Sequence, residues 1–227
     1  MTRVILFDAA GTLIRVRGSV GAAYSSIAAA HGVEVPPADL ETAFGDAFGK
    51  MPPLCFPGRS AAELPALERG WWKTLVREVF RQQEFPDFDA YFDELFAYFA
   101  EPLSWELFFD VRSTLDQLRD RGLRLGIVSN FDGRLTRICE GLGLLPYFEV
   151  VVMSARAGFA KPDPRIFLAT LEALGEAPAD ALHIGDSEKE DVRGARDAGL
   201  QALLIDRSGG APQPHGIRDL RRIVDHL

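Results

Sequence analysis

Five short apolar runs, each ending at a small or acidic residue, place the strongest constraint on the fold of this chain. The runs read VILFD, LRLGIVSN, VVVMSA, ALHIGD and QALLID, and they end at Asp8, Asn130, Ala155, Asp186 and Asp206. Near-continuous runs of valine, isoleucine and leucine are typical of a parallel sheet that is covered by helices on both faces.

Helical patterns separate these strands from about residue 108 onward. The segment VRSTLDQLRDRG places Val111, Leu115 and Leu118 on one face and ends at Gly122, a residue that suits a helix C-terminus. The segments RLTRICEGLG, PRIFLATLEALG and EDVRGARDAG have the same form, and each ends with glycine. Repeated strand and helix units predict an α/β fold with a doubly wound, Rossmann-like parallel sheet.

A segment of different character follows the first strand. GSVGAAYSSIAAAHG predicts a helix of small residues ending at Gly32, and residues 34–105 hold all three tryptophans and no parallel-strand run. ERGWWKTLVREVF and FDAYFDELFAYFAEP predict amphipathic helices with aromatic faces. We therefore expect a core built from residues 1–14 and 106–227, with a helical cap domain formed by residues 15–105 inserted after the first strand.

The net charge and the cysteines indicate which binding partners and which cellular compartment to expect. The net charge of -8 argues against binding to nucleic acid, so an anionic substrate must be met by local donors or by a metal ion. Cys55 and Cys139 lie far apart and predict two reduced thiols. No apolar run is long enough to cross a membrane, and no secretory signal is expected. These features predict a cytoplasmic protein with no membrane or nucleic-acid partner; the oligomeric state stays open.

Polar residues gather where the predicted strands end. Asp8, Ser129 with Asn130, and Asp186 terminate three of the runs, and Lys161 follows a fourth. In an open α/β sheet, ligands bind outside the carboxyl ends of the strands. Each residue alone is more commonly a helix cap, a turn or a solvated loop residue. Their shared position at one edge is what points to a site.

One chemistry accommodates the whole set. A carboxylate such as Asp8 can attack phosphorus and form an acyl phosphate. The attack needs the phosphoryl charge neutralised, which a hydroxyl, a lysine and a divalent ion supply. Mg²⁺ takes oxygen ligands and keeps several waters, so one or two carboxylates and a carbonyl suffice. Asp8 and Asp186 can share the ion, with Asp191 orienting it directly or through water.

At these positions the chain resembles the haloacid dehalogenase-like (HAD) hydrolases, in the subfamily with a C1 cap. The four motifs occur in the family's order as DAAGT, Ser129 in GIVSN, Lys161 in KPDPRIF, and GDSEKED with Asp186 and Asp191. The resemblance covers the whole chain, including the helical insertion.

The resemblance implies a hydrolase that forms an aspartyl-phosphate intermediate. Asp8 would be the nucleophile and a metal ligand, and the backbone carbonyl of Ala10 a second ligand. Ser129 and Lys161 would hold the phosphoryl group of a small phosphorylated substrate. Asp186 and Asp191 would complete a Mg²⁺ site, and Thr12 and Asn130 would add hydrogen bonds.

The predicted cap is similar to one branch of the family. AFGDAFGKMPP, then Gly58 and Arg59, then GWWKTLVREVF resemble the branch grouped with the rhythmically expressed gene 2 product. Trp71 and Trp72 are the most specific part of this likeness, and aromatic residues at helical spacing are expected to pack in a core. Arg59 is expected at the surface. The branch implies a lineage, not a reaction.

Ala10 departs from the pattern of the family's phosphatases, whose second aspartate at this position is the general acid and base. Such help is worth about 10²–10⁴-fold in rate. The carbonyl of Ala10 remains, so the metal ligand is kept and the acid is lost. We therefore expect a phosphatase that is slow or restricted to activated leaving groups, as in acyl or aryl phosphates, unless a water, Glu188 or Glu190 substitutes.

Two other functions stay open at this point. Phosphonoacetaldehyde hydrolases of the family also carry alanine here and cleave a carbon–phosphorus bond with a cap lysine; Lys50 and Lys73 are the candidates, each expected as a surface charge. A catalytically silent binding or regulatory protein is the third reading. Dehalogenases, which place tyrosine at this position and need no acidic fourth motif, are disfavoured by GDSEKED.

Overall fold

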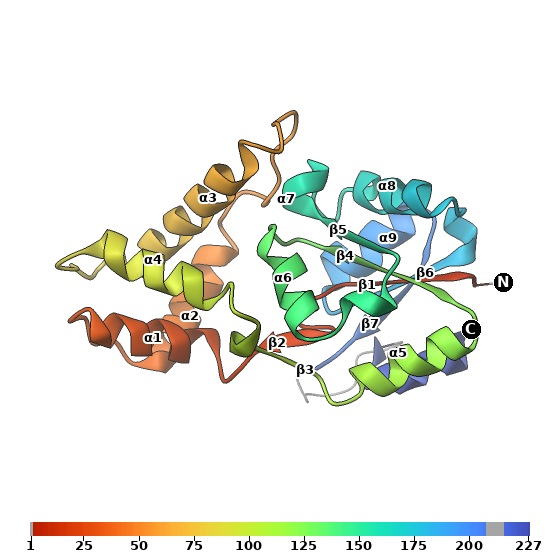
Figure 1. The fold of residues 1–227 in the computed structure, drawn as a ribbon, viewed down its shortest axis with the longest axis horizontal. Coiled ribbons are helices and arrows are strands. Elements are labelled where there is room, and N and C mark those ends of the chain that lie inside the picture. Colours follow the sequence, from red (N-terminus) through yellow and green to blue (C-terminus); the bar gives the residue numbers. More distant parts are fainter. Residues whose placement is uncertain (1, 208–215) are drawn as a thin grey trace.

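A six-stranded parallel sheet forms the centre of the molecule in this computed structural model, which describes residues 2–207 and 216–227 (Figure 1). The strands lie in the order β5-β4-β1-β6-β7-β8, and every pair of neighbours is parallel. Their bounds are β1 Val4–Phe7, β4 Arg124–Ser129, β5 Val150–Met153, β6 Ala181–Gly185, β7 Gln201–Ile205 and β8 Gly216–Ile217. The doubly wound α/β prediction is confirmed.

Helices cover both faces of the sheet, as the near-continuous apolar strands require. Residues of β1 alternate between two clusters: Ile5 and Phe7 pack in one, Val4 and Leu6 in the other. The first cluster includes α5 and α6, and the second includes α8 and α9. The bounds of these helices and of α7 are α5 Val111–Asp120, α6 Arg134–Gly141, α7 Ser154–Ala157, α8 Pro164–Leu174 and α9 Gly194–Asp197. Short 3₁₀ turns span Pro102–Ser104, Leu145–Tyr147, Pro178–Asp180 and Leu220–His226.

Four helices occupy the segment between β1 and the rest of the sheet, and Figure 1 shows them gathered at one end of the molecule. Their bounds are α1 Val20–Ala30, α2 Pro37–Phe48, α3 Leu64–Val79 and α4 Phe88–Tyr98. They share an aromatic-rich cluster of their own that includes Tyr24, Tyr91 and Phe92. The helices predicted from the alanine-rich and aromatic segments are confirmed, and α2 is an additional one. No helix within the described ranges has the length and apolar character to span a membrane.

Two short strands pair where the chain enters the four-helix segment and where it leaves it. β2 (Ile14–Val16) pairs with β3 (Trp105–Leu107), with Ile14 opposite Leu107 and Val16 opposite Trp105. Arg15 binds Glu106 across the pair at 2.8 Å. Strands of three residues are too short to show a period-two pattern. The pair straddles the predicted boundaries after residues 14 and 105, so the division into core and cap at those residues stays a prediction.

Candidate active site

The strand order brings three predicted residues to one edge of the sheet. Asp8 follows β1, Ser129 ends β4 and Asp186 follows β6, and β4 and β6 are the two neighbours of β1. The Ser129 hydroxyl donates to Asp8 Oδ1 at 3.0 Å, with both groups buried. Residues far apart in the sequence are therefore in direct contact, because parallel strands end at the same edge.

Lys161 is buried between two carboxylates. Its Nζ donates to Asp8 Oδ1 and to Asp191 Oδ1, each at 2.6 Å. Burial alone would lower the pKa of Lys161, but the charges of Asp191 and Asp8 outweigh it and raise that pKa above its ordinary value. The ammonium is therefore fully charged at neutral pH and fixed beside the Asp8 carboxylate.

Asn130 holds the loop that carries Lys161. Asn130 Nδ2 donates to the Lys161 carbonyl at 2.9 Å, and Lys161 N donates to Asn130 Oδ1 at 2.8 Å. The same amide nitrogen donates to Glu190 Oε2 at 3.0 Å. These contacts fix the Lys161 backbone to the end of β4. The predicted hydrogen bond from Asn130 to a substrate stays a prediction.

Asp191 is the most fully bonded carboxylate of the site. Its Oδ1 accepts from Lys161 Nζ and from His183 Nε2 at 2.9 Å, and its Oδ2 accepts from Ser187 N at 3.0 Å. Burial opposes ionisation, but Lys161 and the His183 hydrogen bond leave the pKa of Asp191 below its ordinary value. A Cβ at Gly185 would collide with the Asp191 carboxyl group, so glycine is what allows this close approach.

The backbone around Asp191 differs from the regular helix that EDVRGARDAG predicts. Residues Glu188–Arg193 form a π-helix, and α9 begins only at Gly194. Val192 N donates to Ser187 O at 3.2 Å, a bond that spans five residues instead of four. Such wide turns often occur at functional sites. Here the turn lies where the Asp191 carboxylate meets the amide of Ser187.

His183 belongs to the site and was not predicted. It lies in β6, is completely buried, and its Nδ1 has no hydrogen-bond partner among the described residues. Burial lowers the pKa of His183, so the imidazole is neutral with its proton on Nε2, facing Asp191. A histidine inside an apolar run, three residues before Asp186, was the available signal, because a buried imidazole needs a polar partner.

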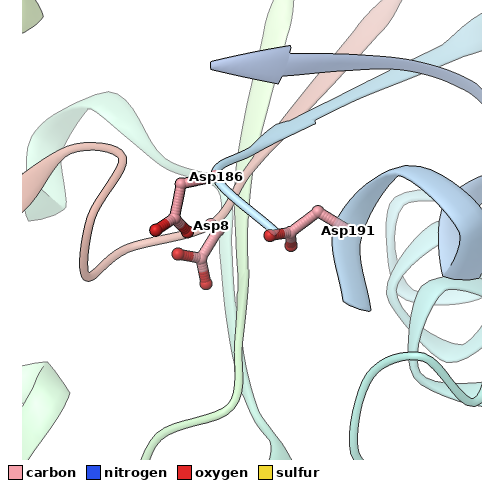
Figure 2. A group of neighbouring side chains, drawn as sticks. All are labelled: Asp8, Asp186 and Asp191. Atoms are coloured by element: carbon pink, nitrogen blue, oxygen red, sulfur yellow. The ribbon is translucent and has the colours of Figure 1, made fainter. Parts of the chain in front are cut away.

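Three aspartates form a group that could hold a metal ion. Asp8, Asp186 and Asp191 each offer a carboxylate oxygen, and these oxygens lie within 4.8 Å of one another (Figure 2). Asp186 is an exposed residue, but partial loss of water around its carboxyl group and the charges of Asp8 and Asp191 raise its pKa to about 7. Burial and Asp191 likewise raise the pKa of Asp8, against the opposing charge of Lys161. The group thus carries an excess of negative charge, and its hard oxygen donors suit Mg²⁺.

In the turn after Asp8, the carbonyls of Ala9 and Ile14 accept the backbone hydrogen bonds, and the carbonyl of Ala10 takes no part in them. The bridge between Ala10 and Ile14 is made by Gly11 N to Ile14 O at 2.8 Å and Ile14 N to Ala9 O at 3.0 Å. Gly11 has a φ of +87°, and a Cβ there would collide with the Asp186 carboxylate. Gly11 therefore permits Asp186 to approach this turn. The methyl group of Ala10 offers no proton.

Thr12 is part of this turn, and its amide donates to the Ala9 carbonyl at 3.3 Å. Its side chain is buried, and Oγ1 has no hydrogen-bond partner among the described residues. Its carbonyl accepts from Arg207 Nη2 at 2.8 Å. A contact between the Thr12 hydroxyl and substrate stays a prediction.

The residues singled out on the helical segment have other partners. Lys73 Nζ binds Asp89 at 2.8 Å, and Arg59 binds Glu63 on the surface at 3.4 Å. Lys50 is exposed. A lysine that forms a Schiff base must direct its amine at the carbonyl of the substrate. The geometry of Lys73 therefore favours an ion pair over the phosphonate chemistry.

Comparison with known proteins places this site in a family. Residues 2–199 match the family described as haloacid dehalogenase-like hydrolase. The chain belongs to the haloacid dehalogenase-like hydrolases. It is 37% identical over 220 residues to haloacid dehalogenase-like hydrolase domain-containing protein 3 of Bos taurus, across 96% of this chain and 86% of that protein.

Two further similarities concern the branch and the fold of this HAD-like hydrolase. Rhythmically expressed gene 2 protein of Drosophila melanogaster is 27% identical over 215 residues, across 89% of this chain and 82% of that protein. A crystal structure described as a HAD phosphatase from Thermococcus onnurineus has a TM-score of 0.67 and 26% identity, covering 100% of this chain and 98% of that one. The family and the branch predicted from the motifs are confirmed.

Proposed function

We propose that this HAD-like hydrolase is a Mg²⁺-dependent phosphatase for small phosphorylated molecules with activated leaving groups. The observation that carries the proposal is the convergence of the Lys161 ammonium and the Ser129 hydroxyl on one oxygen of Asp8. A carboxylate flanked by a cation and a hydroxyl donor fits an attack on phosphorus, because the same donors can then bind the phosphoryl oxygens. The similarity to a HAD phosphatase supports the same class.

Each residue has a distinct task in this proposal. Asp8 attacks phosphorus with the carboxylate oxygen that Ser129 and Lys161 do not occupy. Ser129 and Lys161 then stabilise the phosphoryl oxygens. The acyl phosphate at Asp8 is hydrolysed by water, which returns the carboxylate and releases phosphate.

Asp8, Asp186 and the Ala10 carbonyl would hold Mg²⁺, which supplies positive charge to the phosphoryl group. Asp191 has both oxygens engaged, so its contribution is to position Lys161 and to act on the ion through water. Helices α1 to α4 would serve as the cap.

Metal-dependent hydrolysis of acetyl phosphate tests this proposal. Purified protein should release phosphate from acetyl phosphate in millimolar Mg²⁺, because an acyl phosphate needs no proton on its leaving group. Excess EDTA should abolish release, and added Mg²⁺ should restore it. Release that is insensitive to EDTA would remove the metal from the mechanism. No release under any condition would favour a silent binding protein.

Restoring an acid at position 10 should widen the substrate range. Ala10→Asp should raise turnover of alkyl phosphates by up to about 10²–10⁴-fold, with a smaller gain for acetyl phosphate, because only a poor leaving group needs protonation. Ala10→Asn is the matched control, since asparagine has nearly the same size as aspartate but no acidic proton to give to the leaving group. Steady-state kinetics on both substrates measure the difference. Equal gains for the two substrates, or equal gains for the two variants, would contradict the role assigned to the missing acid.

A further inference from the structure

An apolar cavity lies between helices α1 to α4, the β2-β3 pair and the segment that runs from the end of β4 into α6. Its volume is about 70 Å³, and it is lined from α1 by Val20, from α3 by Trp72, from α4 by Phe96 and from β3 by Trp105. Phe131, in the loop after β4, and Arg134, the first residue of α6, also line it. The cavity thus has walls from both parts of the molecule.

Both chain segments that leave the site reach this cavity. Phe131 follows Ser129 by two residues, so their Cα atoms are at most about 7 Å apart. On the other side Val16 lines the cavity at the end of β2, and β2 begins at Ile14, which is bridged to Ala10. The cavity lining is therefore close along the chain to Ser129 and to the turn that carries Ala10.

Tyr24 lines the cavity with its ring and hydroxyl, and the side-chain nitrogens of the other polar lining residues are engaged in hydrogen bonds. Trp72 Nε1 donates to Asp132 Oδ2, and Trp105 Nε1 donates to Phe99 O at 3.2 Å. Arg134 binds the buried Asp132 through Nη2 to Oδ2 at 2.7 Å and through Nε to Oδ1 at 3.0 Å. Apart from the Tyr24 hydroxyl, an ammonium, carboxylate or hydroxyl placed here would lose its water and meet only side chains that are apolar or already bonded. The cavity therefore selects an uncharged, apolar group.

Ala10 independently selects a leaving group that departs without a proton. A phenol has a pKa of about 10, whereas an alkanol resembles water at about 15.7. Phenolate is thus a far better leaving anion than alkoxide, and it is also aromatic and apolar. A phenol therefore meets both requirements: it is apolar, as the cavity requires, and it leaves without a proton, as the absence of an acid at Ala10 requires.

We propose that the cavity receives one edge of the ring of an aryl phosphate, so that the substrates are phosphate monoesters of small, uncharged phenols. The inference rests on the proposed phosphatase function. The bond from Asp8 to phosphorus forms as the bond from phosphorus to the phenolic oxygen breaks; phenolate takes its proton from solvent, and water releases phosphate from Asp8.

The cavity also limits the size of the ring. A cavity of about 150 Å³ binds a whole benzene molecule, so about 70 Å³ accepts one edge of a single ring and excludes a fused ring. The structure contains a larger cavity of about 460 Å³ between α2 and α3, but its lining is polar and carries Asp39, Asp46, Lys50 and Arg81. That cavity suits no apolar ring.

A substrate series tests the class. We expect kcat/KM for phenyl phosphate to exceed that for 4-carboxyphenyl phosphate and for 1-naphthyl phosphate by tenfold or more, because their leaving groups are all phenols and only charge or size differs. Acetyl phosphate is measured alongside. Turnover of acetyl phosphate with equal rates for the three aryl esters would overturn the inference and leave the phosphatase function standing. Failure on acetyl phosphate would count against the phosphatase function itself.

A matched pair of variants tests the cavity. Val20→Phe should reduce the ratio of phenyl phosphate to acetyl phosphate kcat/KM by tenfold or more, because the added ring fills the space. Val35→Phe makes the same change at another half-buried valine, which lines the polar cavity instead, and should leave that ratio within about twofold of the wild-type ratio. Equal ratios in the two variants would contradict the assignment of this cavity.

A binding measurement on the wild-type protein tests the same cavity and does not depend on whether Val20→Phe folds. Trp72 and Trp105 line the cavity, so ligand entry should change tryptophan fluorescence of the wild-type protein. Phenylphosphonate, which keeps the ring on a bond that this hydrolysis does not break, should bind at least tenfold more tightly than methylphosphonate in the presence of Mg²⁺. Equal affinity for the two phosphonates would show that the ring gains nothing from the cavity.

Discussion

Asp8→Asn should abolish phosphate release from every substrate, with kcat lower by about 10⁴-fold or more, as expected when a nucleophile is removed. An amide oxygen is a poor nucleophile, and asparagine cannot form the acyl phosphate. The fold should survive, because the change conserves shape and removes one of three crowded carboxylates near Asp191 and Asp186. Steady-state kinetics on acetyl phosphate, with a thermal unfolding curve for each protein, measure both effects.

The control for this prediction is a second buried aspartate outside the site. Asp110 is fully buried and binds Arg207 Nη1 at 2.7 Å. Asp110→Asn should lower the melting temperature, because it weakens a buried ion pair, and should keep turnover per folded molecule. Residual activity of Asp8→Asn above about one hundredth of wild type would remove Asp8 from the role of nucleophile.

The position of the site was predictable because it depends on strand ends. Asp8, Ser129 and Asp186 each terminate an apolar run, and a parallel sheet places such ends along one edge. Which strands are neighbours does not follow from the runs alone. The order that puts β1 between β4 and β6 is what brings the Ser129 hydroxyl within 3.0 Å of Asp8.

The contacts that support the site were less predictable because they depend on tertiary packing. In the sequence His183 is one residue of a strand, and only the folded structure shows that Asp191, on the π-helix, accepts its hydrogen bond. The bonds between the Asn130 amide and the Lys161 backbone are a second contact that no motif indicates. Short local patterns do not encode such pairings, since the partners are 8 and 31 residues apart.

In the helical segment, too, the sequence pattern predicts packing but not the tertiary hydrogen bonds. The aromatic spacing around Trp71 and Trp72 predicted packing, and both rings do contact each other and Phe48. The pattern could not show that the Trp72 indole also donates to Asp132, in the loop that follows β4. That bond requires α3 to lie against the loop, which is a property of the assembled fold.

Lys161→Met should be the most destabilising change in the site, lowering the free energy of unfolding by about 3–5 kcal/mol at neutral pH, and it should also abolish turnover. Lys161 is buried and bonded to both Asp8 and Asp191, so its loss leaves two buried carboxylates without their ammonium partner. Methionine keeps the length of the side chain. Urea denaturation measures the loss, and Lys189→Met, an exposed lysine in the same motif, should change stability little.

The pH dependence separates charge from packing at Lys161. The pKa of Lys161 is raised in the folded protein, so its stabilising contribution is complete below its unfolded-state pKa of about 10.4 and is lost only above it. Wild-type protein therefore keeps this contribution from pH 5 to pH 8. In Lys161→Met the folded state, with Asp8 and Asp191 unpaired, should bind protons more readily than the unfolded chain, so stability should rise as pH falls.

The difference in free energy of unfolding between wild type and Lys161→Met should therefore become smaller as the pH is lowered from 8 to 5. Millimolar Mg²⁺ should reduce it further at pH 8, because an ion that binds only the folded carboxylates stabilises that state by mass action. A deficit that is the same at both pH values and insensitive to Mg²⁺ would mean that lost packing, not unpaired charge, is what the substitution costs.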